Sequence, residues 1–136
     1  MAEALFRNLL KCSGKKAEEI NVFSAGTAAI DGQPASPNAV TVVKERGADL
    51  ESHRASMLTR ARILEADLIL TMTRAHKAQV LRMAPEAAEK TYTLKEYITR
   101  SAENIDISDP FGRSVEVYRQ CADEIEEMLK LLLERI

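Results

Sequence analysis

A short apolar run near the middle of the chain constrains the fold most. Leu68, Ile69 and Leu70 lie within a segment, residues 66–72, that has the composition of a buried strand, and Thr73 follows as a helix N-cap. A continuous apolar run is typical of a parallel strand that is covered on both faces. A helix directly after such a strand indicates a βαβ unit with a right-handed crossover. The sequence therefore predicts an α/β fold with a small parallel sheet.

Further helix and strand patterns flank this unit. Helices are expected over residues 2–12, 37–46, 59–65, 74–84 and 114–136, and short strands over 20–23 and 91–93. Ser36 with Pro37 marks a helix start, and Gly47 marks its end. At 136 residues the chain is predicted to form one domain, residues 1–136. Three strands are few for a sheet that carries helices on both faces, so we expect the sheet to be one strand short.

Charge and composition narrow the class of partner. The formal net charge is −2 and the pI is about 5.8, which argues against nucleic acid or an anionic membrane as the main partner. No apolar run has membrane-spanning length, and residues 1–4 do not have the pattern of a signal peptide. Neither Cys12 nor Cys121 has a metal-binding or Cys-x-x-Cys spacing. We therefore expect a reduced, cytoplasmic protein.

The loop before the last helix contains the strongest candidate for catalysis. Asp109 precedes Pro110, which restricts the backbone of the aspartate, and Phe111 and Gly112 follow. An ordinary Asp-Pro turn is one interpretation. A second interpretation is a carboxyl group held beside an exposed aromatic ring, which suits a general acid next to a substrate wall.

The chain as a whole resembles the low-molecular-weight phosphotyrosine protein phosphatases. The matching segments are residues 1–6 (MAEALF), 24–27 (SAGT), 34–39 (PASPNA), 53–54 (HR), 66–73 (ADLILTMT) and 109–112 (DPFG). They occur in the family's order and span the whole chain. The resemblance implies a three-layer α/β/α sandwich, a phosphorylated protein as the substrate, and a reaction that uses no metal and no cofactor.

The resemblance also implies roles for individual residues. Asp109 would be the general acid that protonates the leaving group and then the base that activates water. Phe111 would form one wall of the substrate slot, and Ile30 would form the facing wall. Ser24 and His53 would support the phosphate-binding loop by hydrogen bonds, although Ser24 could equally satisfy a turn and His53 could be an ordinary loop histidine.

One part of the family pattern does not occur in this sequence. The family's central strand and phosphate-binding Cys-x5-Arg loop precede the segment that matches residues 1–6. Cys12 has Glu18 where the motif needs arginine, and it is expected near a helix end; Cys121 is expected on the buried stripe of the last helix. We therefore expect that an upstream segment has been lost through a start at an internal methionine, and that the chain as given is inactive. Unpaired strand edges would favour an oligomer.

The sequence leaves several functional alternatives open. Phe111 followed by Gly112 is more similar to the bacterial protein arginine phosphatases of the family than to its tyrosine-specific members. A non-catalytic binding or regulatory module is an alternative of a different class. An arsenate reductase on the same scaffold is a weaker alternative, because no redox cysteines are suitably placed.

Overall fold

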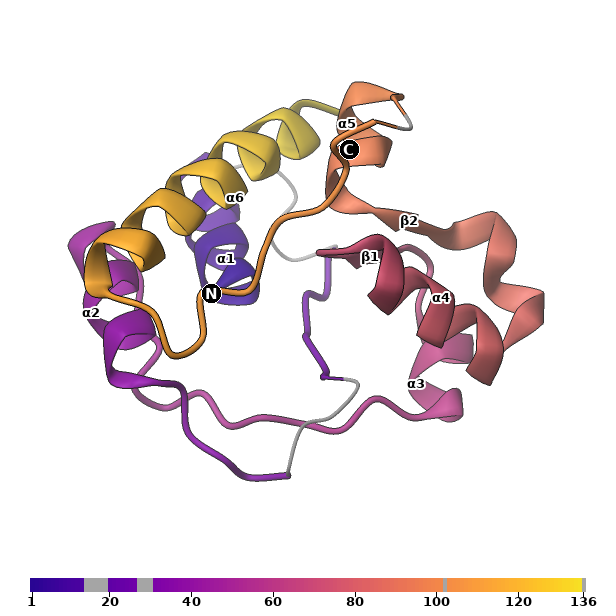
Figure 1. The fold of residues 1–136 in the computed structure, drawn as a ribbon, viewed down its shortest axis with the longest axis horizontal. Helices are drawn as coiled ribbons and strands as arrows, with labels where there is room; N and C mark the ends of the chain where they lie inside the picture. The colour runs from indigo at the N-terminus through magenta and orange to yellow at the C-terminus, as the bar shows by residue number, and fades with distance from the viewer. Residues whose placement is uncertain (14–19, 27–30, 102, 136) are drawn as a thin grey trace.

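The computed structural model describes residues 1–13, 20–26, 31–101 and 103–135 (Figure 1). Its elements, in chain order, are α1 (Ala2–Ser13), α2 (Pro37–Glu45), α3 (Arg60–Glu65), β1 (Ile69–Thr71), α4 (Arg74–Met83), the 3₁₀ helix η1 (Pro85–Lys90), β2 (Thr91–Thr93), α5 (Leu94–Thr99) and α6 (Val115–Arg135). Helices α1, α2 and α6 pack together, and the sheet with α3 and α4 lies beside them (Figure 1).

Side-chain caps fix where several helices begin. Ser36, Thr59 and Thr73 each accept a hydrogen bond from the backbone N–H three residues later, as the sequence predicted. Thr93 caps α5 in the same way, and the Glu96 carboxylate accepts the Thr93 N–H to complete a capping box. Neither α5 nor η1 was predicted from the sequence.

The sheet consists of two short parallel strands within the described residues. Ile69, Leu70 and Thr71 of β1 pair with Thr91, Tyr92 and Thr93 of β2, and α4 lies in the connection between them. The predicted βαβ unit and the predicted strand at 91–93 are therefore confirmed.

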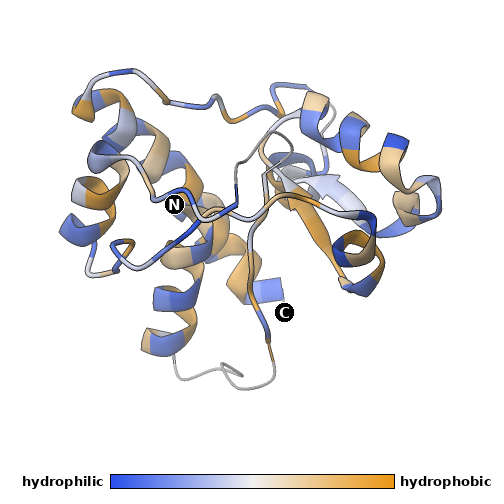
Figure 2. Ribbon diagram, turned by 90° about the horizontal axis from the view of Figure 1, so that it is seen from below, coloured by the Kyte–Doolittle hydropathy of each residue, from blue (hydrophilic) through white to orange (hydrophobic). Residues whose placement is uncertain are grey.

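The strand β1 lies between two apolar clusters. Leu70 packs against the main core, which is built from α1, α2, α5 and α6 around residues such as Leu5, Val42 and Ile125. Ile69 packs on the other side against the smaller cluster around Ile63 of α3 and Val80 of α4. Helices thus cover both faces of the sheet, which confirms the α/β sandwich. Hydrophobic and hydrophilic residues alternate along the helices, as one buried face per helix requires (Figure 2).

Two details of strand burial differ from the sequence prediction. The run at 68–70 was expected to be fully covered, but Leu68 is 36% exposed and Ile69 and Leu70 are half-buried. Residues 20–23 were expected to form a strand, but they belong to no ladder. Ile20 and Val22 still pack against the main core, whereas the side chains between and after them are exposed.

A polar network replaces strand pairing at residues 20–24. The Arg7 guanidinium donates to the Val22 carbonyl oxygen, and the Ser24 hydroxyl donates to Glu3 Oε1 at 2.8 Å. Glu3 Oε2 in turn lies 3.1 Å from Arg7 Nε. This segment is therefore held against α1, and no backbone hydrogen bond joins it to β1 within the described part of the chain.

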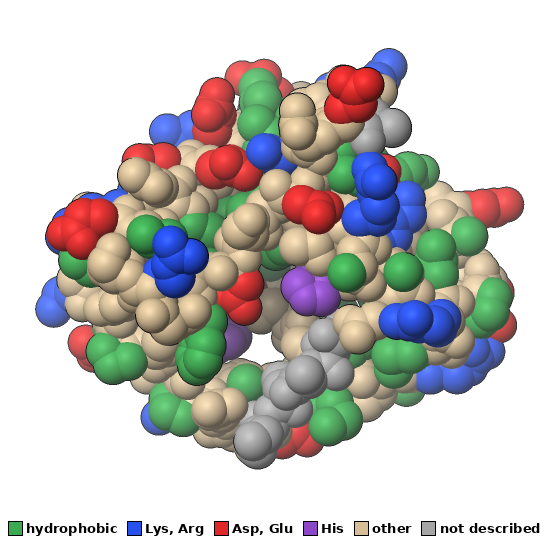
Figure 3. Space-filling view, in the orientation of Figure 1, with side chains coloured by type: hydrophobic (Ala, Val, Ile, Leu, Met, Phe, Trp, Pro, Cys, Tyr) green, Lys and Arg blue, Asp and Glu red, His purple; other side chains and the backbone are tan. Residues whose placement is uncertain are grey.

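The surface carries charges of both signs. Acidic and basic side chains are interspersed over the face in Figure 3. Among the described residues, no helix has both the length and the apolar character that crossing a membrane requires.

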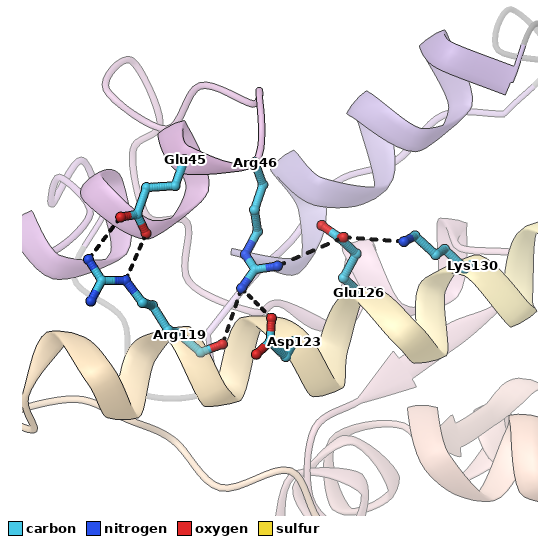
Figure 4. Close-up of polar contacts among 6 residues, drawn as sticks. All are labelled: Glu45, Arg46, Arg119, Asp123, Glu126 and Lys130. Carbon is cyan, nitrogen blue, oxygen red and sulfur yellow. Dashed lines mark hydrogen bonds and ion pairs between the residues drawn. The ribbon is translucent and has the colours of Figure 1, made fainter.

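Ion pairs join the end of α2 to the outer side of α6 (Figure 4). The Glu45 carboxylate forms a bidentate ion pair with Arg119, whose Nε and Nη2 donate to its two oxygens at 3.0 and 2.8 Å. Arg46 reaches the Asp123 carboxylate at 2.5 Å and the Arg119 carbonyl oxygen at 3.2 Å. The hydrogen bond from Arg119 lowers the pKa of Glu45. This pair is exposed, so solvent and salt screen it.

A more sheltered carboxylate supports α5. Burial alone would raise the pKa of Glu96, but hydrogen bonds from Lys77 and from the Thr93 amide outweigh it, and the pKa is lowered from 4.5. A carboxylate whose folded-state pKa is depressed stabilises the protein above its unfolded pKa. That stabilisation is lost as the pH falls through the folded-state value.

We expect Glu96→Gln to lower the melting temperature at pH 7 by about 3 °C, the shift for roughly 1 kcal/mol in a chain of this size. The difference from the parent should shrink as the pH falls through the lowered pKa of Glu96, because the carboxylate of the parent then takes up a proton. Thermal melts followed by circular dichroism at several pH values measure this. The control is Glu127→Gln, because Glu127 has no ion-pair partner among the described residues. An equal loss at pH 7 and pH 3.5 would contradict the assignment.

Candidate active site

A pocket of about 330 Å³ lies at the N-terminal end of α1. Asp109 and Phe111 line it from the loop before α6, and His53 lines it from the segment after α2. Met1 and Tyr118 also line it. Figure 3 shows this side of the molecule hollowed near its centre, with acidic and histidine side chains nearby. Segments far apart in the sequence thus contribute to one concave site.

The Asp109 loop is a tight turn. Asp109 Oδ1 accepts the Phe111 N–H at 3.0 Å, and the Arg113 N–H donates to the Pro110 carbonyl oxygen at 2.9 Å. Gly112 has φ +78°, the left-handed conformation that the third position of a type II turn requires. One carboxylate oxygen therefore orients the loop, and the other has no hydrogen-bond partner among the described residues. The turn interpretation and the functional interpretation are compatible.

Contacts on both sides fix the position of this loop. Upstream, the Ile107 N–H donates to the Met72 carbonyl oxygen at 2.8 Å, just after β1. Downstream, Asn38 Nδ2 of α2 donates to the Arg113 carbonyl oxygen at 3.2 Å. Pro110 is buried, whereas Phe111 is 75% exposed. The exposed ring is available as a wall for a bound group.

The other predicted site residues are only partly brought together. His53 is half-buried and lines the pocket with Asp109. Ser24 does not line this pocket, and its hydroxyl donates to Glu3. Ile30 lies outside the described residues. Asp106, just before this loop, is exposed and accepts the first N–H of α4, from Arg74, at 2.7 Å.

The sequence interpretation missed three polar residues of the pocket, Gln33, Ser36 and Tyr118. Tyr118 was not singled out in the sequence, and Ser36 was predicted only to start a helix. In the structure Ser36 and Tyr118 both line the pocket, and their hydroxyl oxygens lie 3.0 Å apart. The signal that could have found Tyr118 is its hydroxyl, because a buried tyrosine oxygen usually needs a polar partner.

Neither cysteine lies in the pocket. Cys12 is exposed at the end of α1, and Cys121 is half-buried on α6, with its Sγ 3.6 Å from the Ser108 carbonyl oxygen. Burial, reinforced by Glu124, raises the pKa of the Cys121 thiol, which makes it a poor nucleophile. Cys121 is less buried than predicted. No cluster of three metal-ligating side chains occurs among the described residues.

The fold is an α/β sandwich with a concave site at the start of α1, and comparisons with known proteins show its family. The chain belongs to the low molecular weight phosphotyrosine protein phosphatase family, whose model matches residues 1–136.

Its relatives include arginine phosphatases. The chain is 40% identical to a protein-arginine-phosphatase of Geobacillus stearothermophilus and 39% identical to one of Bacillus subtilis; the match covers 100% of this chain and 86% and 87% of those proteins. A solved structure of a YwlE arginine phosphatase mutant with a phosphorylated active-site serine aligns with a TM-score of 0.90 at 39% identity, over 98% of this chain and 84% of that one.

Proposed function

We propose that the pocket around Asp109 is the leaving-group and substrate side of a protein phosphatase site. The observation that carries this proposal is the position of the Asp109 carboxylate in a pocket beside an exposed aromatic ring and Met1, the residue directly before α1. A carboxyl group at such a site can protonate a departing side chain and then take a proton from water. Phe111 is assigned to the substrate wall, and Ile30 to the facing wall.

The supporting roles of His53 and Ser24 belong to the same proposal. His53 is in place to hydrogen-bond a phosphate-binding loop from inside the pocket. The Ser24 hydroxyl donates to Glu3 and lies outside the pocket. Ser24 would therefore reach such a loop from the segment 20–24 and not from inside the pocket. A helix N-terminus offers free N–H groups to a phosphate, and α1 begins at this pocket.

The substrate class we favour is phosphoarginine in proteins. Two relatives at about 40% identity are named arginine phosphatases, and Phe111-Gly112 follows the Asp-Pro pair. Phosphotyrosine is the alternative, because the family is named for it. A wall formed by an exposed phenylalanine suits either planar group.

Phosphoryl transfer in this family pattern requires a cysteine nucleophile and an arginine in Cys-x5-Arg spacing. Attack by the thiolate would form a cysteinyl phosphate while Asp109 protonates the leaving group; water activated by Asp109 would then release phosphate. No metal is needed if backbone amides and an arginine stabilise the charge of the transition state. Neither cysteine of this sequence has arginine six positions later.

We therefore expect residues 1–136 to hydrolyse neither an aryl phosphate nor a phosphoarginine peptide above background. Phosphate release is the measurement, with Cys12→Ser and Asp109→Ala as comparison variants. Turnover that survives Asp109→Ala and disappears in Cys12→Ser would show that Cys12 is the nucleophile and that the proposed site is wrong.

A non-catalytic binding module is the second candidate function. The observation that favours it is that both cysteines lie outside the pocket that holds Asp109. Such a module would bind phosphorylated protein without releasing phosphate. Saturable binding of a phosphopeptide that requires the pocket residues, in a chain that shows no turnover, distinguishes it from the first candidate.

The compartment and the assembly state are part of the proposal. Two unpaired cysteines fit a reducing compartment such as the cytoplasm. The second edge of β1 is unpaired within the described residues and favours association between copies.

A further inference from the structure

A second concave surface lies away from the Asp109 pocket and shares no residue with it. It has a volume of about 750 Å³ and is lined by four separate parts of the chain: α4, β2, α5 with the residues after it, and the end of α6. We call it the tyrosine groove, after Tyr92 and Tyr97. Their ring centroids are 5.1 Å apart at an interplanar angle of 55°.

The charge balance of the tyrosine groove is opposite to that of the whole chain. Lys77, Arg100 and Arg135 line it together with one acid, Glu96, whereas the chain has a net charge of −2. Lys77 Nζ lies 2.6 Å from Glu96 Oε1, so this pair is neutral. Two arginines therefore remain as positive charges in the groove.

The two arginines differ in how they are held. Arg135 donates from both Nη atoms to the Tyr97 and Ile98 carbonyl oxygens, at 2.6 Å each, which fixes its guanidinium at the end of α5. Arg100 is exposed, has φ +57°, and has no side-chain partner among the described residues. A guanidinium with free donors binds a carboxylate through two parallel hydrogen bonds.

The aromatic part of the groove supplies apolar contact area. The Tyr92 ring has Lys77 Nζ 5.9 Å from its centroid and its hydroxyl donates to the Glu89 carbonyl oxygen at 3.1 Å. The ring is therefore held in place before any partner binds. Preorganised aromatic rings beside a cation are typical of surfaces that bind peptide segments.

From this combination we propose that the tyrosine groove docks an acidic peptide segment of a protein partner. Carboxylates of the segment bind Arg100, and its apolar side chains lie on the tyrosine rings. The acidic segment belongs to the phosphorylated substrate protein; this step rests on the function proposed above. An overall acidic chain disfavours nucleic acid as the occupant.

The spacing of the two sites defines the substrate that could use both. Tyr118 of the Asp109 pocket and Arg135 of the groove lie on the same helix, 17 positions apart, which is about 25 Å along its axis. An extended peptide spans roughly 3.3 Å per residue. The acidic segment must therefore lie at least about eight residues from the phosphorylated residue.

Fluorescence anisotropy of a labelled peptide tests the docking proposal directly, without any turnover. The probe is a twelve-residue peptide rich in Asp and Glu with two Leu residues, titrated with residues 1–136. We expect saturable binding, weakened about fivefold in Arg100→Gln and further in Arg100→Glu, since an exposed charge pair contributes up to ~1 kcal/mol. The matched control is Arg82→Gln, an exposed arginine on α4 outside the groove, which should bind like the parent.

Three results would overturn the proposal. They are equal affinity for a Lys-rich peptide of the same length, equal weakening by Arg82→Gln and Arg100→Gln, and tighter binding of a labelled oligonucleotide than of the acidic peptide. Peptide binding is measured without phosphate release. A chain that binds the peptide but shows no turnover would therefore support the docking site even if the proposed function fails. Circular dichroism melts confirm that the variants are folded.

Discussion

Replacing Asp109 by alanine is expected to lower phosphatase turnover by about 10²- to 10⁴-fold, the usual contribution of a general acid. The measurement needs a form of the protein that carries an apolar strand and a Cys-x5-Arg-Ser-Pro loop joined ahead of Met1. Asp109 lines the pocket next to that junction, and its turn is fixed by the Phe111 N–H. Without the carboxyl group, the leaving group must depart without a proton.

The dependence on the leaving group identifies the role of Asp109. The loss should be largest for strongly basic leaving groups and smaller for an aryl phosphate whose phenolate is already stable. Asp67→Ala is the control, because Asp67 is exposed and lies outside the pocket. Unchanged turnover of Asp109→Ala on poor leaving groups would show that another residue is the acid.

The sequence predicted those parts of the fold that depend on local interactions. Ser36, Thr59 and Thr73 cap helices because each side chain bonds an amide three residues later, which only the local sequence decides. The strand after residue 66 was found for a similar reason, since its apolar run is continuous. The capping box of Thr93 and Glu96 is equally local, and a search for that pattern would have found α5.

Residues 20–23 show what a local pattern cannot decide. Their alternating burial is that of a strand, yet a strand also needs a neighbouring ladder, which the described residues do not provide. Hydrogen bonds with Arg7 and Glu3, and not a strand ladder, hold the segment against α1. The strand predicted at residues 20–23 was therefore wrong, because alternating burial alone does not supply a neighbouring strand.

The candidate site was only partly predictable for a related reason. Asp109 and Phe111 belong to one turn, so their motif is visible in the sequence. Tyr118 and Ser36 meet only because α2 packs on α6, and their contact joins residues 82 positions apart. The tyrosine groove is assembled from four segments and has no sequence motif.

Association between copies of the chain is expected at the second edge of β1. β1 pairs with β2 on one side, and its other edge has no backbone partner among the described residues. Leu68, directly before β1, is 36% exposed, and Phe23 of the neighbouring segment is 50% exposed. An unpaired edge beside exposed apolar side chains invites pairing with another chain. We therefore expect residues 1–136 to associate in a concentration-dependent way and to melt with low cooperativity.

A lysine beside the edge should oppose this association, because a charged side chain there would have to lose its water on pairing. We expect Leu68→Lys to weaken self-association by about tenfold, which corresponds to ~1.4 kcal/mol. Sedimentation equilibrium over a range of concentrations measures the change. Leu131→Lys is the matched control, since Leu131 is 39% exposed on α6, away from the strand, and it should associate like the parent. A parent chain that stays monomeric and melts in one sharp, cooperative transition would contradict the prediction and show that the edge of β1 is protected.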